Sequence, residues 1–198
     1  MSTNRTVGIL LFDDVEVLDF AGPFEVFSVT GRRNGSDPFD VFTVAETQRP
    51  IAARNQLIVS PRYSFADCPH IDVLVVPGGF GTRREMRNDK VLDFVKTRTE
   101  RAELVLSVCT GALILGRAGL LDGLPATTHH GAVELLKEIA PAARVQGDRR
   151  VIDNGKIVVA AGVSSGIDAA FYVVSRLLGH EVAAETAHYI EYPLPPNA

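Results

Sequence analysis

Residues Leu104–Gly111 read LVLSVCTG and decide the fold of this chain. The first five residues form the kind of apolar run expected of a strand that is buried on both faces. The segment that follows, Thr110–Gly119, is rich in small and branched apolar residues and predicts a helix, with Cys109 at the joint. Because a strand that leads directly into a helix is the building unit of helix-covered parallel sheets, this stretch predicts an α/β fold.

The same alternation of short apolar runs and longer helical segments extends in both directions from this stretch. It predicts a doubly wound, mostly parallel sheet with helices on both faces, and no repeat or linker divides residues 1–198 into more than one domain. The other expected strands are Val7–Leu11, Phe39–Ala45, Leu57–Ser60, Val73–Val76, Val145–Ile152 and Lys156–Ala160. The other expected helices are Asp19–Gly31, with Pro23 in its first turn, Lys90–Arg101, Ala132–Ile139, Ser165–Leu178 and Glu181–Tyr189.

The composition limits the classes of protein to which the chain can belong. Its 198 residues are 46% hydrophobic and carry 20 Lys and Arg against 24 Asp and Glu, so we expect a folded domain with no nucleic-acid partner. The two cysteines, Cys68 and Cys109, form neither a disulfide framework nor a pair with metal-ligand spacing, which favours a reducing compartment. The first apolar run, Val7–Phe12, is too short for a membrane span or a signal-peptide core. We therefore expect a cytoplasmic protein without a membrane contact.

Two strand ends carry the candidate chemistry, because open α/β sheets bind ligands outside the carboxyl ends of their strands. One is Pro77–Gly81, PGGFG, whose glycines allow backbone amides to approach a ligand. The other is the turn at Cys109, which resembles a nucleophile elbow with Cys in place of Ser and with Gly111 two positions later. A thiol at a helix N-terminus is expected to have a lowered pKa. The amides of Thr110 and Gly79 are expected to hold negative charge that develops on a substrate.

Each candidate also has an ordinary structural interpretation. Cys109 is equally compatible with a small buried side chain, and Cys68, which has no helix start behind it, is expected to be structural. Asp19 opens the first predicted helix, where an Asp commonly acts as a cap. Beside a thiolate, however, its carboxyl group would be protonated and would serve as a general acid.

Other polar motifs predict structure and no ligand. His129 and His130 are adjacent, and sequence neighbours do not share a face of a helix or strand, so without clustered partners they predict no metal site. Residues 162–166, GVSSG, lack the Gly-Lys-Ser/Thr ending of a phosphate loop. Ser165 and Asp168 have the spacing of a helix capping box, so this segment is expected only to start a helix.

Four segments together resemble the ThiJ/PfpI superfamily of class I glutamine amidotransferase-like domains. They are Leu18–Phe27 (LDFAGPFEVF), Ser107–Ala112 (SVCTGA), Ala118–Gly123 (AGLLDG) and Ala126–His129 (ATTH). The first segment, together with Cys-Thr-Gly at the elbow, is most similar to the branch that contains isonitrile hydratase and the amidotransferase-like halves of certain AraC-type regulators. The resemblance covers nearly the whole chain and implies a flavodoxin-like fold.

Carried over by position, the resemblance assigns roles to particular residues. It implies that Cys109 is the nucleophile, that Asp19 reaches the thiol from the first helix, and that Thr110 is required for hydratase activity. It also implies that Gly78 and Gly79 contribute to substrate binding.

The same resemblance makes His129 a polar wall of the pocket. Two positions depart from relatives. Intracellular peptidases of the superfamily have His where this chain has Thr110, which argues against peptidase activity, and His130 replaces a Trp of close relatives.

The implied activity is the hydration of an isonitrile to an N-substituted formamide by a cofactor-independent, homodimeric lyase. Cys109 would add to the terminal isonitrile carbon to give a thioimidate, Asp19 would deliver the proton, and water would release the formamide. Two alternatives stay open: a glyoxalase- or deglycase-like enzyme that acts on 2-oxoaldehydes, and a ligand or cysteine-oxidation sensor related to the regulators. The apolar side chains of Asp19–Phe27 exceed one helix face, which adds a reason to expect a dimer.

Overall fold

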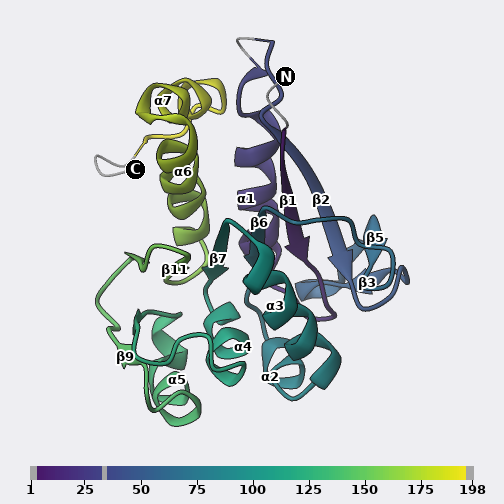
Figure 1. The fold of residues 1–198 in the computed structure, drawn as a ribbon, viewed down its shortest axis with the longest axis vertical. Coiled ribbons are helices and arrows are strands. Elements are labelled where there is room, and N and C mark those ends of the chain that lie inside the picture. Colours follow the sequence, from purple (N-terminus) through teal and green to yellow (C-terminus); the bar gives the residue numbers. More distant parts are fainter. Residues whose placement is uncertain (1–3, 33–34, 195–198) are drawn as a thin grey trace.

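A seven-stranded sheet forms the centre of the computed structural model, which describes residues 4–32 and 35–194 (Figure 1). The strands lie in the order β10-β11-β7-β6-β1-β2-β5, and every neighbouring pair is parallel except β10 with β11. The consecutive strands β2-β1-β6-β7-β11 have the 2-1-3-4-5 order of a flavodoxin-like sheet, so the predicted fold class is confirmed. The bounds are β1 Arg5–Leu10, β2 Phe39–Ala45, β5 Tyr63–Ser64, β6 Val73–Val76, β7 Leu104–Val108, β10 Val151–Asp153 and β11 Ile157–Ala160.

Two groups of helices pack on the sheet. One group is α1 (Val17–Val29), α6 (Ser165–Leu178) and α7 (His180–Tyr189), which contact one another. The other is α2 (Thr82–Glu85), α3 (Asp89–Arg101), α4 (Gly111–Arg117) and α5 (Val133–Ile139), linked through contacts with α4. Figure 1 shows α1 behind the sheet and α3 in front of it. Within the described ranges, no helix is both long and apolar enough to cross a membrane.

Short elements complete the chain outside the main sheet. Strands β3 (Ile51–Ala52) and β4 (Ile58–Val59) form one small ladder, and β8 (Pro125–Ala126) and β9 (Arg144–Val145) form another. The 3-10 turns η2 (Arg54–Gln56) and η3 (His130–Ala132) lie in the connections.

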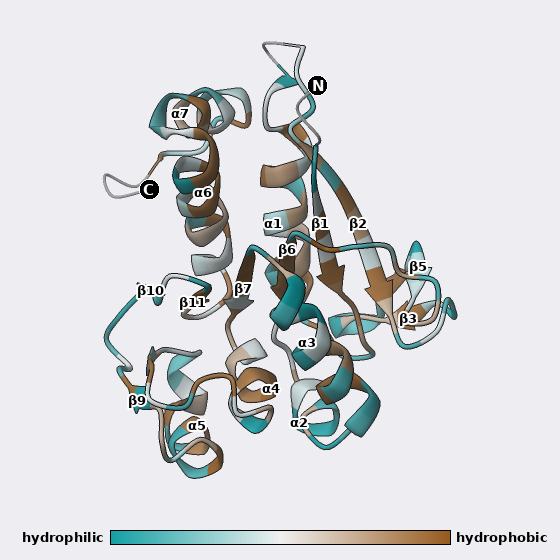
Figure 2. Ribbon diagram, in the orientation of Figure 1, coloured by the Kyte–Doolittle hydropathy of each residue, from teal (hydrophilic) through white to brown (hydrophobic). Residues whose placement is uncertain are grey.

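The core lies where the central strands are covered on both faces. Every residue of β6 and β7 is buried, which explains why both read as continuous apolar runs and not as alternating ones. In Figure 2, α3 shows hydrophilic colour toward the viewer, while the strands behind it are largely hydrophobic. The rigid centre of the sheet therefore ends directly at Cys109 and at the Pro77–Gly81 turn.

Two details of the secondary structure differ from the prediction. Helix α1 begins at Val17, so the placement of Pro23 in its first turn is wrong: Pro23 lies inside the helix, where it cannot donate to the carbonyl of Asp19. The single strand expected over 145–152 is also wrong. The segment forms two strands, β9 and β10, because residues 146–150, which include Gly147, form a loop between them.

Candidate active site

Cys109 occupies a strained elbow between β7 and α4. Its φ is 56°, in the left-handed region that a residue with a side chain rarely adopts. Its amide donates to the carbonyls of Ala160 (3.1 Å) and Ala161 (2.8 Å), which ties the turn to the end of β11. Gly111 allows α4 to start here, because a Cβ at this position would lie 2.1 Å from the carbonyl oxygen of Val76. The thiol is fixed at the carboxyl edge of the sheet with 5% of the residue exposed.

Asp19 reaches this elbow from the first turn of α1. It is completely buried, and its Oδ2 accepts a hydrogen bond from the Gly78 amide at 3.0 Å. The capping interpretation of Asp19 is wrong, because Glu16 holds the cap position and the Asp19 carboxylate binds another segment. The other oxygen, Oδ1, accepts no hydrogen bond of regular geometry from any residue that the structure describes. The Cys109 thiol is a proton donor within reach of this carboxylate.

The turn after β6 holds Asp19 and the elbow together. A Cβ at Gly78 would lie 2.5 Å from the amide nitrogen of Thr110 and 2.8 Å from Asp19 Oδ2, so only glycine fits between them. The Gly79 amide donates to Thr110 Oγ1 at 2.9 Å, and the Thr110 hydroxyl can donate to the Gly79 carbonyl at 3.1 Å. Because the Gly79 amide has this partner, the oxyanion role of Gly79 stays a prediction. The amides that stabilise the thiolate of Cys109 belong to Thr110 and Val163.

The thiol and the carboxyl group shift one another's protonation. Burial raises the pKa of Asp19 to about 7, although hydrogen bonds from Cys109 and Gly78 oppose the shift. Burial, followed by the charge of Asp19, raises the pKa of Cys109 to about 12. The predicted lowering of the thiol pKa is therefore wrong, because desolvation and a neighbouring carboxylate outweigh the amides at a short helix end. Between about pH 7 and pH 12 the pair holds a single proton.

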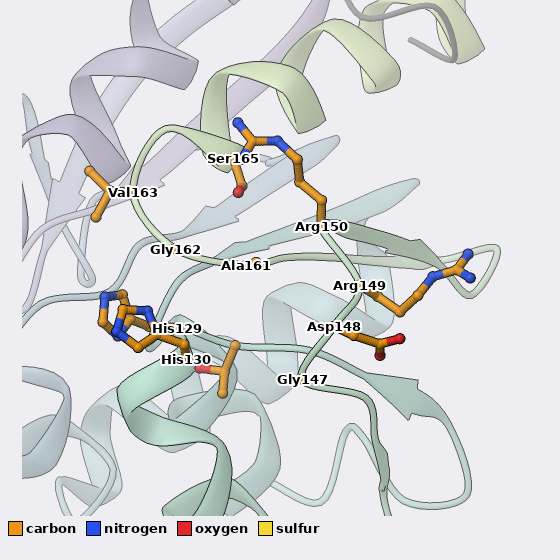
Figure 3. A pocket seen from close by; sticks show the side chains of 11 residues that line it. His129, His130, Gly147, Asp148, Arg149, Arg150, Ala161, Gly162, Val163 and Ser165 are labelled. Atoms are coloured by element: carbon orange, nitrogen blue, oxygen red, sulfur yellow. The ribbon is translucent and has the colours of Figure 1, made fainter.

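His129 stands beside the elbow as a neutral ring. Its Nδ1 accepts from the Gly131 amide at 3.1 Å, so the neutral ring carries its proton on Nε2. Burial, then His130 and Arg83, lower the pKa of His129. The ring lies against that of His130, with 4.1 Å between the centroids and the planes inclined by 34°, and a Cβ at Gly162 would approach its Cδ2 to 2.7 Å. His129 is thus held between the neighbouring ring and the backbone, and both histidines line a cavity of about 430 Å³ (Figure 3).

Val163 is a site residue that the sequence did not predict. This β-branched residue has a φ of 40°, and its amide hydrogen-bonds the sulfur of Cys109. The available signal was a glycine-containing loop at the end of a central strand, which was interpreted only as the start of a helix. The capping box proposed for that helix is also wrong. Ser164 occupies the cap position, while Asp168 accepts hydrogen bonds from Arg150 and from Tyr192.

The described residues hold no group of three or more His, Cys, Asp or Glu side chains that could bind a metal ion. The elbow, the buried carboxyl group and the Gly78–Gly79 turn instead make a site suited to nucleophilic and proton-transfer chemistry.

Comparison with known proteins places this architecture in a family. The model of the DJ-1/PfpI family matches residues 5–176. The chain belongs to the DJ-1/PfpI family. Among curated relatives of this DJ-1/PfpI protein, "Isonitrile hydratase" of Pseudomonas putida is 35% identical over 191 residues, which are 96% of this chain and 80% of that protein.

Two further comparisons extend the range of relatives. The "HTH-type transcriptional regulator GbdR" of Pseudomonas aeruginosa is 24% identical over 95% of the DJ-1/PfpI chain, which spans 51% of the regulator's length. The crystal structure of a ThiJ/PfpI family protein from Pseudomonas syringae superimposes with a TM-score of 0.86 at 30% identity. That match covers 98% of this chain and 78% of the other. The family resemblance noted from the sequence is confirmed, and the relatives include both an enzyme and a regulator.

Proposed function

We propose that this DJ-1/PfpI protein is an isonitrile hydratase-like lyase that converts an isonitrile to an N-substituted formamide. The observation that supports this proposal most is the buried pair of Asp19 and Cys109, which shares one proton at the elbow. Isonitrile addition requires both members of such a pair, because one carbon atom receives the nucleophile and the proton. Because a relative that is 35% identical is named isonitrile hydratase, we propose this reaction ahead of other activities of the family.

The first step forms a carbon–sulfur bond. The ionised carboxylate of Asp19 accepts the thiol proton as Cys109 Sγ attacks the terminal carbon of R–N≡C, and the same proton is delivered to that carbon. The product is the thioimidate R–N=CH–S–Cys109, and Asp19 is again ionised. No proton is exchanged with solvent in this step, which suits a carboxylate with no exposed surface.

The second step consumes water. Asp19 accepts a proton from a water molecule that attacks the thioimidate carbon, and it delivers this proton to the nitrogen, which gives the tetrahedral adduct R–NH–CH(OH)–S–Cys109. Collapse of the tetrahedral adduct breaks the carbon–sulfur bond and releases R–NH–CHO, and the remaining proton returns to the thiol. The net reaction is R–NC plus water to R–NH–CHO, with Asp19 and Cys109 restored.

In this scheme the Thr110 side chain acts by positioning other groups of the site. Its hydroxyl binds both the amide and the carbonyl of Gly79, so it fixes the turn whose other glycine holds Asp19. Loss of the hydroxyl would loosen the carboxylate relative to the thiol. We therefore include Thr110 among the residues that the activity requires.

Turnover of purified protein tests the proposal directly. A panel of neutral alkyl isonitriles and methylglyoxal is offered separately, with formamide and lactate measured by NMR and Cys109→Ala protein as the blank. Formamide without lactate is the expected result. Lactate alone would favour the glyoxalase-like alternative, and neither product would favour the sensor and overturn the proposal.

We also propose that the protein forms a homodimer through α1. Phe20, Val26 and Phe27 pack within the chain, but Leu18 and Phe24 remain 38% and 37% exposed. Apolar side chains on the outer side of a helix are suited to a subunit contact. Sedimentation at micromolar concentration should show a dimer that Phe24→Glu dissociates.

A matched substitution distinguishes a specific contact from general solubility. Phe80 is 61% exposed and lies outside α1, so Phe80→Glu should leave the dimer intact. A wild-type monomer, or equal effects of both substitutions, would contradict the dimer proposal.

A further inference from the structure

The cavity beside His129 lies next to the elbow, although Cys109 itself is not one of the residues that line it. It has a volume of about 430 Å³, within the usual range for small-molecule sites. One wall is the adjacent rings of His129 and His130, a second is the loop Gly147–Arg150, and a third is Ala161–Val163 with Ser165 (Figure 3). Val163 belongs to this wall and also donates its amide to the Cys109 sulfur. A substrate attached at the thiol would therefore extend its far end along this cavity.

Ser165 is the least expected group in the cavity wall. It is 1% exposed, and its hydroxyl points from the first turn of α6 toward the cavity in Figure 3. In the described part of the chain the neighbouring Arg150 donates to Asp168 and Ser164, and the Ser165 hydroxyl has no side-chain or carbonyl partner. This oxygen is not among the side-chain atoms of the described residues that are enclosed without a partner, so it is open to the cavity and can donate a hydrogen bond to a ligand there.

The other polar groups of the cavity are mainly donors. His129 carries its neutral-ring proton on Nε2, and the Arg150 guanidinium is held at the wall by Asp168 and by Ser164 Oγ (3.3 Å). Asp148 is the acidic residue among those that line the cavity, and Figure 3 shows its carboxylate turned away. The positive end of the α6 dipole adds to this bias for a negatively charged acceptor.

We propose that this cavity receives a carboxylate at the far end of the substrate. The inference rests on the proposed function for the reactive end only, because an isonitrile group is uncharged and gives the enzyme little by which to select its R group. Ser165, His129 and Arg150 would donate to the carboxylate oxygens. The substrate class is then a short ω-isocyano carboxylic acid.

A series of matched substrates tests the inference. Isocyanoacetate, 3-isocyanopropanoate and 4-isocyanobutanoate are each compared with their methyl esters, which carry the same reactive group without the charge. At least one acid should have a kcat/KM about tenfold or more above that of its ester, through KM. Ser165→Ala should bring that ratio close to one, because a hydrogen bond to a charged group contributes about tenfold or more in binding. Equal kcat/KM for every acid and ester would overturn the proposal.

Ser175→Ala is the control, since it makes the same change on α6 outside the residues that line the cavity. It should leave the acid-to-ester ratio at the wild-type value. A ratio lowered equally by both substitutions would show an effect on α6 and not on a carboxylate contact, and would also overturn the proposal.

A binding measurement separates this inference from the proposed function. Calorimetric titration with N-formylglycine, N-formyl-β-alanine and 4-formamidobutanoate requires no turnover. Binding that Ser165→Ala weakens about tenfold, in a protein that converts no isonitrile, would support the carboxylate cavity and overturn the hydratase proposal. Turnover of neutral isonitriles with no carboxylate binding or preference would do the reverse.

Discussion

Cys109 lies at the end of a central strand, whereas Cys68 lies in the loop between β5 and β6. Burial raises the pKa of both thiols. Cys68 is half-buried, its thiol donates to the Pro69 carbonyl at 3.4 Å, and the nearby Arg98 opposes the rise in its pKa. The neighbour of Cys109 is instead the carboxylate of Asp19, which raises the thiol pKa further. A low thiol pKa therefore does not distinguish Cys109 from Cys68. The features that do are an adjacent proton acceptor, Asp19, and a strained turn at which several segments meet.

Removal of each thiol is the strongest test of this comparison. Cys109→Ala should reduce kcat by about 10⁴-fold or more, because no other described side chain replaces the attacking sulfur. Cys68→Ala should leave kcat within about twofold of the wild-type value, since its loop contributes no residue to the elbow. Formamide release measured on both variants, after circular dichroism confirms their folding, decides the point. A large loss in Cys68→Ala would contradict the assignment of reactivity to the elbow.

Asp19→Asn tests the partner that Cys68 lacks. Asn keeps a carbonyl for the Gly78 amide but cannot relay the thiol proton, so kcat should fall by about 10²–10⁴-fold. Glu25→Gln, an exposed change on the same helix, is the control and should retain full activity. An unchanged rate in Asp19→Asn would reduce Asp19 to a structural residue.

The same substitution should stabilise the protein at alkaline pH. The pKa of Asp19 is about 7 in the folded protein against an ordinary value of 3.8, so the folded state binds this proton more tightly than the unfolded state. The resulting stabilisation is complete below about pH 4 and is lost as the pH rises through 7. Urea unfolding at pH 8 should therefore show Asp19→Asn more stable than wild type by about 2–4 kcal/mol. The difference should shrink steadily toward pH 4, and a pH-independent difference would contradict the shifted pKa.

The pH dependence of turnover should report the shared proton. Below about pH 7 both members of the pair are protonated, so kcat/KM should fall roughly tenfold per pH unit. Above 7 it should stay level to at least pH 9, because the thiol proton is lost only near 12. An Asp19→Asn enzyme should lack the inflection near 7. A rate that instead falls above pH 7 would show that the doubly protonated pair is the active form.

The sequence predicted the strands and helices that carry the site because their signals are local. β6 and β7 are continuous apolar runs, and Gly111, two positions after Cys109, indicates that a helix begins directly after the strand. The same locality explains the errors. Pro23 suggested a first turn, yet Val17 and Leu18 extend α1 toward the N-terminus.

The groups that the sequence did not predict depend on contacts between distant segments. The amide of Val163 meets the sulfur of Cys109 across 54 residues of chain, and nothing in GVSSG specifies that meeting. Ser165 looked like part of a capping box because spacing alone cannot show that Asp168 binds Arg150. The thiol pKa was predicted in the wrong direction for a related reason: a helix N-terminus is visible in sequence, whereas the burial of Cys109 and the approach of Asp19 are not.

Alkylation rates test the raised pKa of Cys109 and should show the smallest of the predicted effects. Iodoacetamide reacts with thiolates, so at pH 8 the half-buried Cys68 should be labelled before Cys109, which is 5% exposed and has a pKa of about 12. Asp19→Asn removes the charge that helps to raise this pKa, so Cys109 should then be labelled several-fold faster, up to about tenfold per pKa unit, while the Cys68 rate stays the same. The variant would thus be the less active enzyme with the more reactive thiol. Peptide mass spectrometry over a time course gives both rates in one sample. If Cys109 is labelled first in the wild type, it is a thiolate stabilised by the helix end, and the shared-proton pair is wrong.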